Sequence, residues 1–142
     1  MKKLYVLTGL ILLAQVCAAC SCITKSLEKN YQESSQVAVV KVVKINYDPN
    51  NDALLILNVE TINQLKGKKS TKYKTDALFY KNPTKAGITG KYDCVFDIKV
   101  GSTWILFASK NDGLPYFQYC SYSTDNKQRI SKIIAEIKNF TT

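Results

Sequence analysis

Four of the five cysteines are the residues whose type and spacing point most directly to chemistry, because the fifth, Cys17, falls in a predicted leader: Cys20, Cys22, Cys94 and Cys120. An even number of cysteines in a small exported domain indicates two disulfides, and four cysteines allow three pairings. A bridge between Cys20 and Cys22 is the least favourable pairing because its ring would strain disulfide geometry. Both other pairings tie residues 20 and 22 to the second half of the chain. A structural zinc site made by all four thiolates is the alternative interpretation.

The sequence contains no histidine, which limits the chemistry that the remaining residues can perform. Zinc-ligand sets that combine cysteine with histidine are excluded, as are Ser–His and Cys–His nucleophile pairs. Serine and carboxylate residues are scattered, without a Gly-rich phosphate loop or a paired-carboxylate motif. We therefore predict that the protein is not an enzyme and uses no cofactor.

Residues 1–19 have the pattern of a signal peptide. Lys2 and Lys3 precede an apolar run, and the small residues at 17–19 suit a cleavage site. That run is too short to span a bilayer, and no later segment is longer, so we expect no transmembrane helix. These features predict a secreted, extracellular domain over residues 20–142. The alternative is a bacterial lipoprotein, because Ala18-Ala19-Cys20 also suits lipidation of Cys20 and anchoring to a membrane.

The net charge indicates which partners the mature chain prefers. The sequence carries +9, and removal of the leader with its two lysines leaves +7. A basic secreted protein favours acidic partners such as sulfated glycans or anionic surfaces, with plain solubility as the other interpretation. Export argues against nucleic-acid binding. We expect a monomer, and Asn139-Phe140-Thr141 is a glycosylation sequon if the source is eukaryotic.

The elements that must position the cysteines are mostly strands. Runs rich in β-branched and aromatic residues, separated by Gly, Pro and Asn clusters, predict five strands. From about Asp125 isoleucines recur at helical spacing, which predicts an amphipathic helix with Thr124 or Asp125 as its N-cap. This order indicates a mainly β fold, a small closed barrel covered by a C-terminal helix. The predicted strands are Val37–Ile45, Ala53–Ile62, Tyr73–Tyr80, Trp104–Ala108 and Tyr116–Tyr122.

These features, taken in order, resemble the N-terminal domain of the tissue inhibitors of metalloproteinases (TIMPs). Cys20-Ser21-Cys22 resembles the Cys-x-Cys that opens the family, and Tyr31 falls where the family places an aromatic residue. The segment from Ser34 to Val43 resembles its first strand, and Leu65-Lys66-Gly67 its short Lys-Gly turn. The best match is Leu106 to Tyr122, with a strand, an Asp-Gly turn, a strand and a Cys-Ser-aromatic sequence.

The resemblance implies a fold and a cysteine pairing. The fold is netrin-like, a five-stranded OB-like closed barrel with flanking helices, and the bridges are Cys20–Cys94 and Cys22–Cys120. Two departures stand out. Gln32 replaces the cysteine that follows the family's aromatic residue, so the third bridge of this domain is missing. The family's cysteine-rich C-terminal subdomain also has no counterpart in the sequence.

The resemblance further implies an inhibitor whose partner is a zinc metalloprotease of the matrix metalloproteinase type. The free amine and the carbonyl of Cys20 would chelate the zinc of the protease, and Ser21 would enter its S1′ pocket. Contacts along the primed side and at a second edge would come from Cys22, Ile23, Thr24, Tyr92 and Asp93. The alternative is a netrin-like binding module that inhibits nothing and uses its cysteines only as structural bridges.

Overall fold

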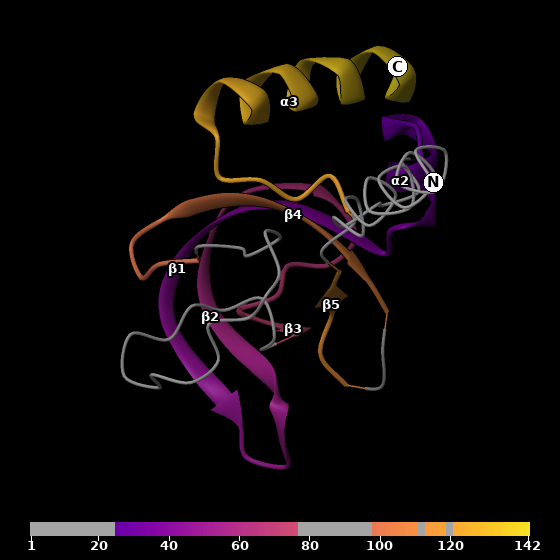
Figure 1. Cartoon of the computed structure of the whole chain (residues 1–142). Helices are drawn as coiled ribbons and strands as arrows, with labels where there is room; N and C mark the ends of the chain where they lie inside the picture. The colour runs from indigo at the N-terminus through magenta and orange to yellow at the C-terminus, as the bar shows by residue number, and fades with distance from the viewer. Residues whose placement is uncertain (1–24, 77–97, 111–112, 119–120) are drawn as a thin grey trace, which may run out of the picture.

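The computed structural model describes residues 25–76, 98–110, 113–118 and 121–142 (Figure 1). The described part is mainly β, one five-stranded sheet with a C-terminal helix, which confirms this level of the sequence prediction. The elements in chain order are α2 (Leu27–Glu33), β1 (Gln36–Asp48), β2 (Asn51–Lys66), β3 (Lys72–Asp76), β4 (Thr103–Ser109), β5 (Tyr116–Phe117) and α3 (Lys127–Thr141).

Each strand of the sheet pairs with two others. The order is β1-β2-β3-β5-β4, and β4 returns to β1 through antiparallel pairing of Gln36–Lys41 with Thr103–Ala108. β3 and β5 form a parallel pair at Lys74 and Tyr116, whereas the other pairs are antiparallel. Because the pairing returns to its first strand, the backbone groups of β1 and β4 are used on both sides and are not left as an open edge.

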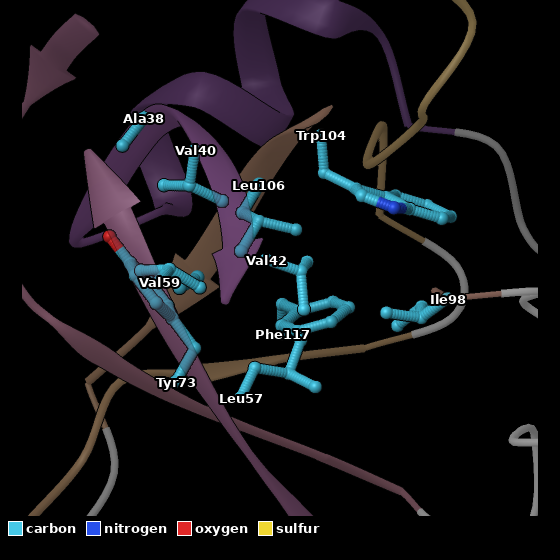
Figure 2. Packing of buried hydrophobic residues seen from close by; sticks show 11 residues of the cluster. Ala38, Val40, Val42, Leu57, Val59, Tyr73, Ile98, Trp104, Leu106 and Phe117 are labelled. Atoms are coloured by element: carbon cyan, nitrogen blue, oxygen red, sulfur yellow. The ribbon is translucent and has the colours of Figure 1, made fainter. Parts of the chain in front are cut away.

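The first half of β1 is buried on both of its faces, as are the middle residues of β4. Side chains alternate along a strand, so successive residues enter two different clusters. The inner cluster, shown in Figure 2, consists of Ala38, Val40, Val42, Leu57, Val59, Tyr73, Ile98, Trp104, Leu106, Ala108 and Phe117. The helix-facing cluster consists of Leu27, Val37, Val39, Ile105, Phe107, Ile130, Ile133 and Ile137, with Tyr31, Leu65, Tyr122, Ile134 and Phe140 packed against it.

Helix α3 lies across the outer side of β1 and β4 (Figure 1). Its isoleucine stripe packs against residues of these two strands. Ile130, Ile133 and Ile137 are buried, which confirms the amphipathic helix. The predicted N-cap was wrong, because Asn126 caps the helix and its Oδ1 accepts a hydrogen bond of 3.0 Å from the backbone N–H of Arg129. Thr124 is unavailable for capping because its backbone pairs with Ile105, at 3.0 and 3.2 Å, and stays extended.

Other element boundaries differ from the sequence prediction. β2 continues beyond Ile62 to Lys66 because it stays paired with β1 along that length. In the predicted strand Tyr116–Tyr122, β5 ends at Phe117, and Gln118, Ser121 and Tyr122 are not in a strand, whereas residues 119–120 lie outside the described residues. Thr124 pairs with Ile105 of β4. β3 begins at Lys72, and residues 77–80 of the predicted third strand lie outside the described residues. The short helix α2 has no counterpart among the segments predicted from sequence pattern.

The turn between β1 and β2 lies at the end of the sheet opposite α3 (Figure 1). Asp48 Oδ1 accepts a hydrogen bond of 3.0 Å from the backbone N–H of Asn50, which fixes the turn. Asp48 Oδ2 lies 2.7 Å from Lys74 Nζ of β3. These two contacts hold the pKa of Asp48 below its usual value, with the hydrogen bond from Lys74 as the larger cause. The turn itself is residues 49–50, within the gap between the predicted strands Val37–Ile45 and Ala53–Ile62.

Candidate functional site

The residues predicted to carry function all lie outside the described residues: Cys20, Ser21, Cys22, Ile23, Thr24, Tyr92, Asp93, Cys94 and Cys120. The same holds for the signal peptide, residues 1–19. The structure does describe the residues that adjoin residues 20–24 and 119–120 in the chain. Lys25 follows Thr24 directly, and Gln118 and Ser121 stand on either side of residues 119–120. The surroundings of these three residues therefore define the candidate site.

Lys25, Gln118 and Ser121 line one pocket of about 270 Å³. Its walls come from Lys25 before α2, the last turn of α2 with Ser34 after it, the end of β4, and β5 with the residues that follow it. The pocket lies at the lower limit of size for a small-molecule site. Its lining is mixed, because Phe107 lies in it together with Asn30, Glu33, Ser34, Ser109 and Tyr116. The pocket brings the chain just after residue 24 next to both sides of residues 119–120.

Helix α2 begins at Leu27, close to the first described residue, Lys25, and a neighbouring side chain caps its first turn. Ser26 is the N-cap, and its Oγ accepts a hydrogen bond of 3.2 Å from the backbone N–H of Lys29. Lys25 forms an ion pair with Glu33 at the other end of the helix. That contact lowers the pKa of Glu33, because the hydrogen bond from Lys25 stabilises its carboxylate. Both side chains are about half exposed, so we assign the pair little stabilising weight.

The C-terminal half of α2 is attached to the end of β2. Tyr31 donates its hydroxyl proton to the carbonyl of Leu65 at 3.0 Å, and its ring packs edge-on against Phe140 of α3 at 5.5 Å. Lys66 Nζ lies 2.6 Å from the carbonyl oxygen of Tyr31 and 2.9 Å from that of Gln32. The motif residues Tyr31 and Leu65-Lys66, far apart in sequence, are therefore in direct contact.

Residues 121–124 are held along β4 by a network of hydroxyl groups. Ser123 Oγ accepts a hydrogen bond of 3.1 Å from the backbone N–H of Phe107, and it lies 2.6 Å from Ser121 Oγ. The Tyr122 ring packs against Phe107 with ring centroids 6.1 Å apart. The chain that follows residues 119–120 is thus anchored on the strand whose Phe107 lines the pocket.

Two tyrosines near the sheet have perturbed pKa values for different reasons. Tyr73 is fully buried in the inner cluster, and its hydroxyl has no hydrogen-bond partner among the described residues. Burial raises the pKa of Tyr73 to about 12. Tyr116 instead donates a hydrogen bond of 2.6 Å to Asp76 Oδ2. Burial, and then the adjacent carboxylate, raise the pKa of Tyr116 above its ordinary value.

Within residues 25–76, 98–110, 113–118 and 121–142, no group of three or more His, Cys, Asp or Glu side chains could hold a metal. In the same ranges no helix is long and apolar enough to cross a membrane. Among the polar side chains that line the pocket, Ser34 and Ser109 bond to the backbone carbonyls of Asn30 and Tyr116.

The contact between α2 and the end of β2 is a feature that sequence reasoning missed. Ser26 as an N-cap and the pair Leu27 and Tyr31 at i, i+4 were the available signals for a helix here. Neither signal predicts which part of the sheet the helix would contact. A lysine in a strand end is usually solvated, so nothing in the sequence marks Lys66 as a residue that bonds to helix carbonyls.

In comparisons with known proteins, no protein-family model matches this chain, and no curated protein matches it. The likeness to the TIMP domain therefore rests on the residues and spacings themselves. Those residues fall into two sets: Tyr31, Leu65, Lys66 and most of Leu106–Tyr122 are described, whereas the cysteines are not.

Proposed function

We propose that this chain is a secreted, TIMP-like inhibitor of zinc metalloproteases. The catalytic zinc of such proteases keeps one position open for water. The free α-amine and the carbonyl oxygen of Cys20 form a five-membered chelate that displaces this water. The amine binds in its neutral form, and an ordinary α-amino pKa of about 7.7–8.0 lets it lose its proton near neutral pH. Ser21 then enters the S1′ pocket, and Ile23 and Thr24 follow along the primed side.

The observation that carries this proposal is the convergence of chain segments at the pocket. Cys22 precedes Lys25 by three residues, and Cys120 lies between Gln118 and Ser121, which line the same pocket as Lys25. Three residues of extended chain span at most about 10 Å. A Cys22–Cys120 bridge, whose Cα atoms must come within about 7 Å, is therefore compatible with the described geometry. The proposed second bridge, Cys20–Cys94, would fix residue 20 itself.

Two bridges at residues 20 and 22 would hold the inhibitory segment in one extended pose. A preorganised segment loses less conformational entropy when it binds, which raises affinity without further contacts. The described helix α2 adds to this order, because it continues the chain from Lys25 and is attached to the sheet. Tyr92 and Asp93, next to Cys94, would form the second edge of the contact with the protease.

We also propose that the sheet is an OB-like closed barrel of the netrin-like type. The strand order β1-β2-β3-β5-β4, the return of β4 to β1 and the parallel pairing of β3 with β5 support this assignment. The two helices lie against the same side of the sheet, as flanking helices of such a domain would. A protein of this kind would act outside the cell as a monomer.

A second candidate function, a binding module for anionic glycans, is favoured by one surface. Between Glu60 and Asp76 there are five lysines and no acidic residue. Lys68, Lys69 and Lys72 are exposed and make no ion pair within the described residues. Lys44 and Lys72 both lie opposite Asn58 in the sheet, so they share one row across three strands. A sulfated polysaccharide offers the repeated negative charge that suits such a surface.

The inhibitor proposal is tested with a matched pair of proteins. One begins at Cys20, and the other carries a single additional alanine before Cys20. The first should inhibit the catalytic domain of a matrix metalloproteinase in a fluorogenic peptide assay, whereas the extended protein should not, since its amine lies one residue away from the chelating position. Equal inhibition by the two proteins would rule out the chelate. Ser21→Gly should change which proteases are inhibited more than it changes stability.

The glycan proposal is tested by heparin chromatography. Replacement of Lys68, Lys69 and Lys72 by glutamine should lower the salt concentration that elutes the protein. The control replaces Lys127, Arg129 and Lys132 of α3 by glutamine, with the same change in charge. If both triple variants elute at the same salt concentration, the affinity for heparin follows net charge alone, and the surface formed by Lys68, Lys69 and Lys72 has no specific role.

A further inference from the structure

Helix α2 depends on tertiary contacts for its position. It has seven residues, and isolated helices shorter than about 12–15 residues are marginal in water. Leu27 is its only residue with a buried side chain, and its last turn contains no basic residue of its own. Ser34 caps the carbonyl of Asn30 through its backbone N–H and its hydroxyl, which leaves the carbonyls of Tyr31 and Gln32 for a donor from outside the helix. The helix is also the described element that directly follows the proposed inhibitory segment.

Lys66, at the end of β2, is that donor. Its ammonium group bonds to the carbonyl oxygens of Tyr31 at 2.6 Å and Gln32 at 2.9 Å, and it lies 4.9 Å from the centre of the Tyr31 ring. A cation at this place complements the negative end of the helix dipole as well as the orphan carbonyls. In return, the Tyr31 hydroxyl donates to the carbonyl of Leu65 at 3.0 Å. The two segments thus exchange contacts in both directions.

The residue after Lys66 brings β2 into contact with the chain that leaves α2. Gly67 has a φ of +74°, which favours glycine. A Cβ atom on Gly67 would lie 2.2 Å from the carbonyl oxygen of Ser35 and 3.0 Å from Cγ of Gln36. No side chain fits in that space, so the backbone at Gly67 packs directly on the link between α2 and β1. This close approach holds the backbone of Lys66 near the end of α2, within reach of the carbonyls of Tyr31 and Gln32.

We propose that Lys66 is a positioning residue, which holds α2 and, through it, the segment that ends at Thr24. Its role in inhibition rests on the proposed function, whereas its role in ordering α2 does not. Lys66 supplies two of the polar contacts that join α2 to the sheet, and the Tyr31 hydroxyl supplies another. Loss of the ammonium group should therefore loosen the helix while the sheet stays folded.

The experiment compares Lys66→Met with the wild-type chain, Lys66→Arg and Lys69→Met. Methionine keeps the apolar stem and removes the donors, arginine restores donors, and Lys69 is an exposed lysine of the same connection. Amide hydrogen exchange is followed at Asn30 and Ser34, whose N–H groups bond to the carbonyls of Ser26 and Asn30 at 2.9 and 3.0 Å. In Lys66→Met both should exchange at least tenfold faster, with protection retained in the other two variants. Equal exchange in Lys66→Met and Lys69→Met would overturn the proposal.

A second readout separates this proposal from the proposed function. Lys66→Met should raise the inhibition constant for a matrix metalloproteinase several-fold relative to Lys69→Met, and Lys66→Arg should restore it. If the wild-type chain itself does not inhibit, the proposed function fails, and hydrogen exchange still decides whether Lys66 orders α2. If exchange increases in Lys66→Met but inhibition is unchanged, Lys66 does not position the inhibitory segment.

Discussion

The two faces of β1 and β4 serve different purposes, although they belong to the same strands. The inner cluster receives side chains from every strand of the sheet, so its packing depends on the whole sheet. The helix-facing cluster joins β1 and β4 to α2 and α3, with Leu65 of β2 at its margin. Only this second face contacts the helix that follows the proposed inhibitory segment. The comparison indicates that one face determines whether the domain folds and the other how its N-terminal region is held.

The largest effect is expected for Phe117→Ala in the inner cluster. Phe117 is fully buried among residues of several strands (Figure 2). Truncation of a buried phenylalanine costs about 3–5 kcal/mol, because transfer energy and packing are both lost. Urea unfolding followed by circular dichroism should show this loss in the free energy of unfolding. A cost below about 1 kcal/mol would show that the inner cluster does not determine stability.

Ile133→Ala in the helix-facing cluster should have a smaller effect on stability and a distinct local one. Ile133 is buried, and its truncation should cost about 2–4 kcal/mol. Because α2 packs on the same cluster, amide exchange in α2 should also become faster, whereas inner strand amides should change only with global stability. Ala135→Gly, on the exposed side of α3, is the control and should cost about 1 kcal/mol through helix propensity. Unchanged α2 exchange would contradict the coupling between the two helices.

The two tyrosines should respond in opposite directions to loss of their hydroxyl groups. Tyr116→Phe removes a hydrogen bond to a carboxylate and should lower stability by about 1–2 kcal/mol. Tyr73→Phe removes a buried hydroxyl without a partner in the described structure and should raise stability by about 1 kcal/mol. Thermal unfolding of both variants at neutral pH gives the comparison. A loss of stability in Tyr73→Phe would mean that this hydroxyl has a partner in solution.

Tyr73 also predicts a specific dependence on alkaline pH. Its pKa of about 12 in the folded chain lies above the value of about 10 in an unfolded one. Ionisation of Tyr73 therefore leaves stability unchanged below about pH 10 and lowers it progressively as the pH rises from about 10 to 12, because only the unfolded chain loses the proton readily in that range. Denaturant titrations across this range should show a smaller decline in Tyr73→Phe than in the wild-type chain. Identical declines would show that Tyr73 does not govern this loss.

The smallest effect should come from the turn at the opposite end of the sheet, which touches neither helix. The pKa of Asp48 is lowered by Lys74 and by the backbone of Asn50. Its contribution to stability is thus present above the unfolded pKa of about 3.9 and is lost as the pH falls further. Asp48→Asn should make urea midpoints less sensitive to pH between about 5 and 2. An undiminished sensitivity would assign the acid response to other carboxyl groups.

The sequence predicts the sheet better than it predicts the attachment of the N-terminal region. β-branched runs identify β1, β2 and β4, and the isoleucine stripe identifies α3. Strand alternation cannot reveal that Val37 to Val40 are buried on both faces, because a continuous apolar run has no period. The short helix α2 was not predicted, although Ser26 and the spacing of Leu27 and Tyr31 were signals for it; its attachment through Lys66 could not be predicted, because lysine is ordinarily solvated. The cysteines and their neighbours stay predictions, since they lie outside the described residues.

The account depends most on the state of residue 20 in the natural molecule. Intact mass combined with N-terminal sequencing and disulfide mapping of the exported protein tests it directly. We predict a chain that begins at Cys20 with an unmodified amine, bridges Cys20–Cys94 and Cys22–Cys120, and no added lipid mass. A diacylglyceryl group on Cys20, a blocked amine or a different first residue would contradict the chelate and leave a β-sheet domain with another function.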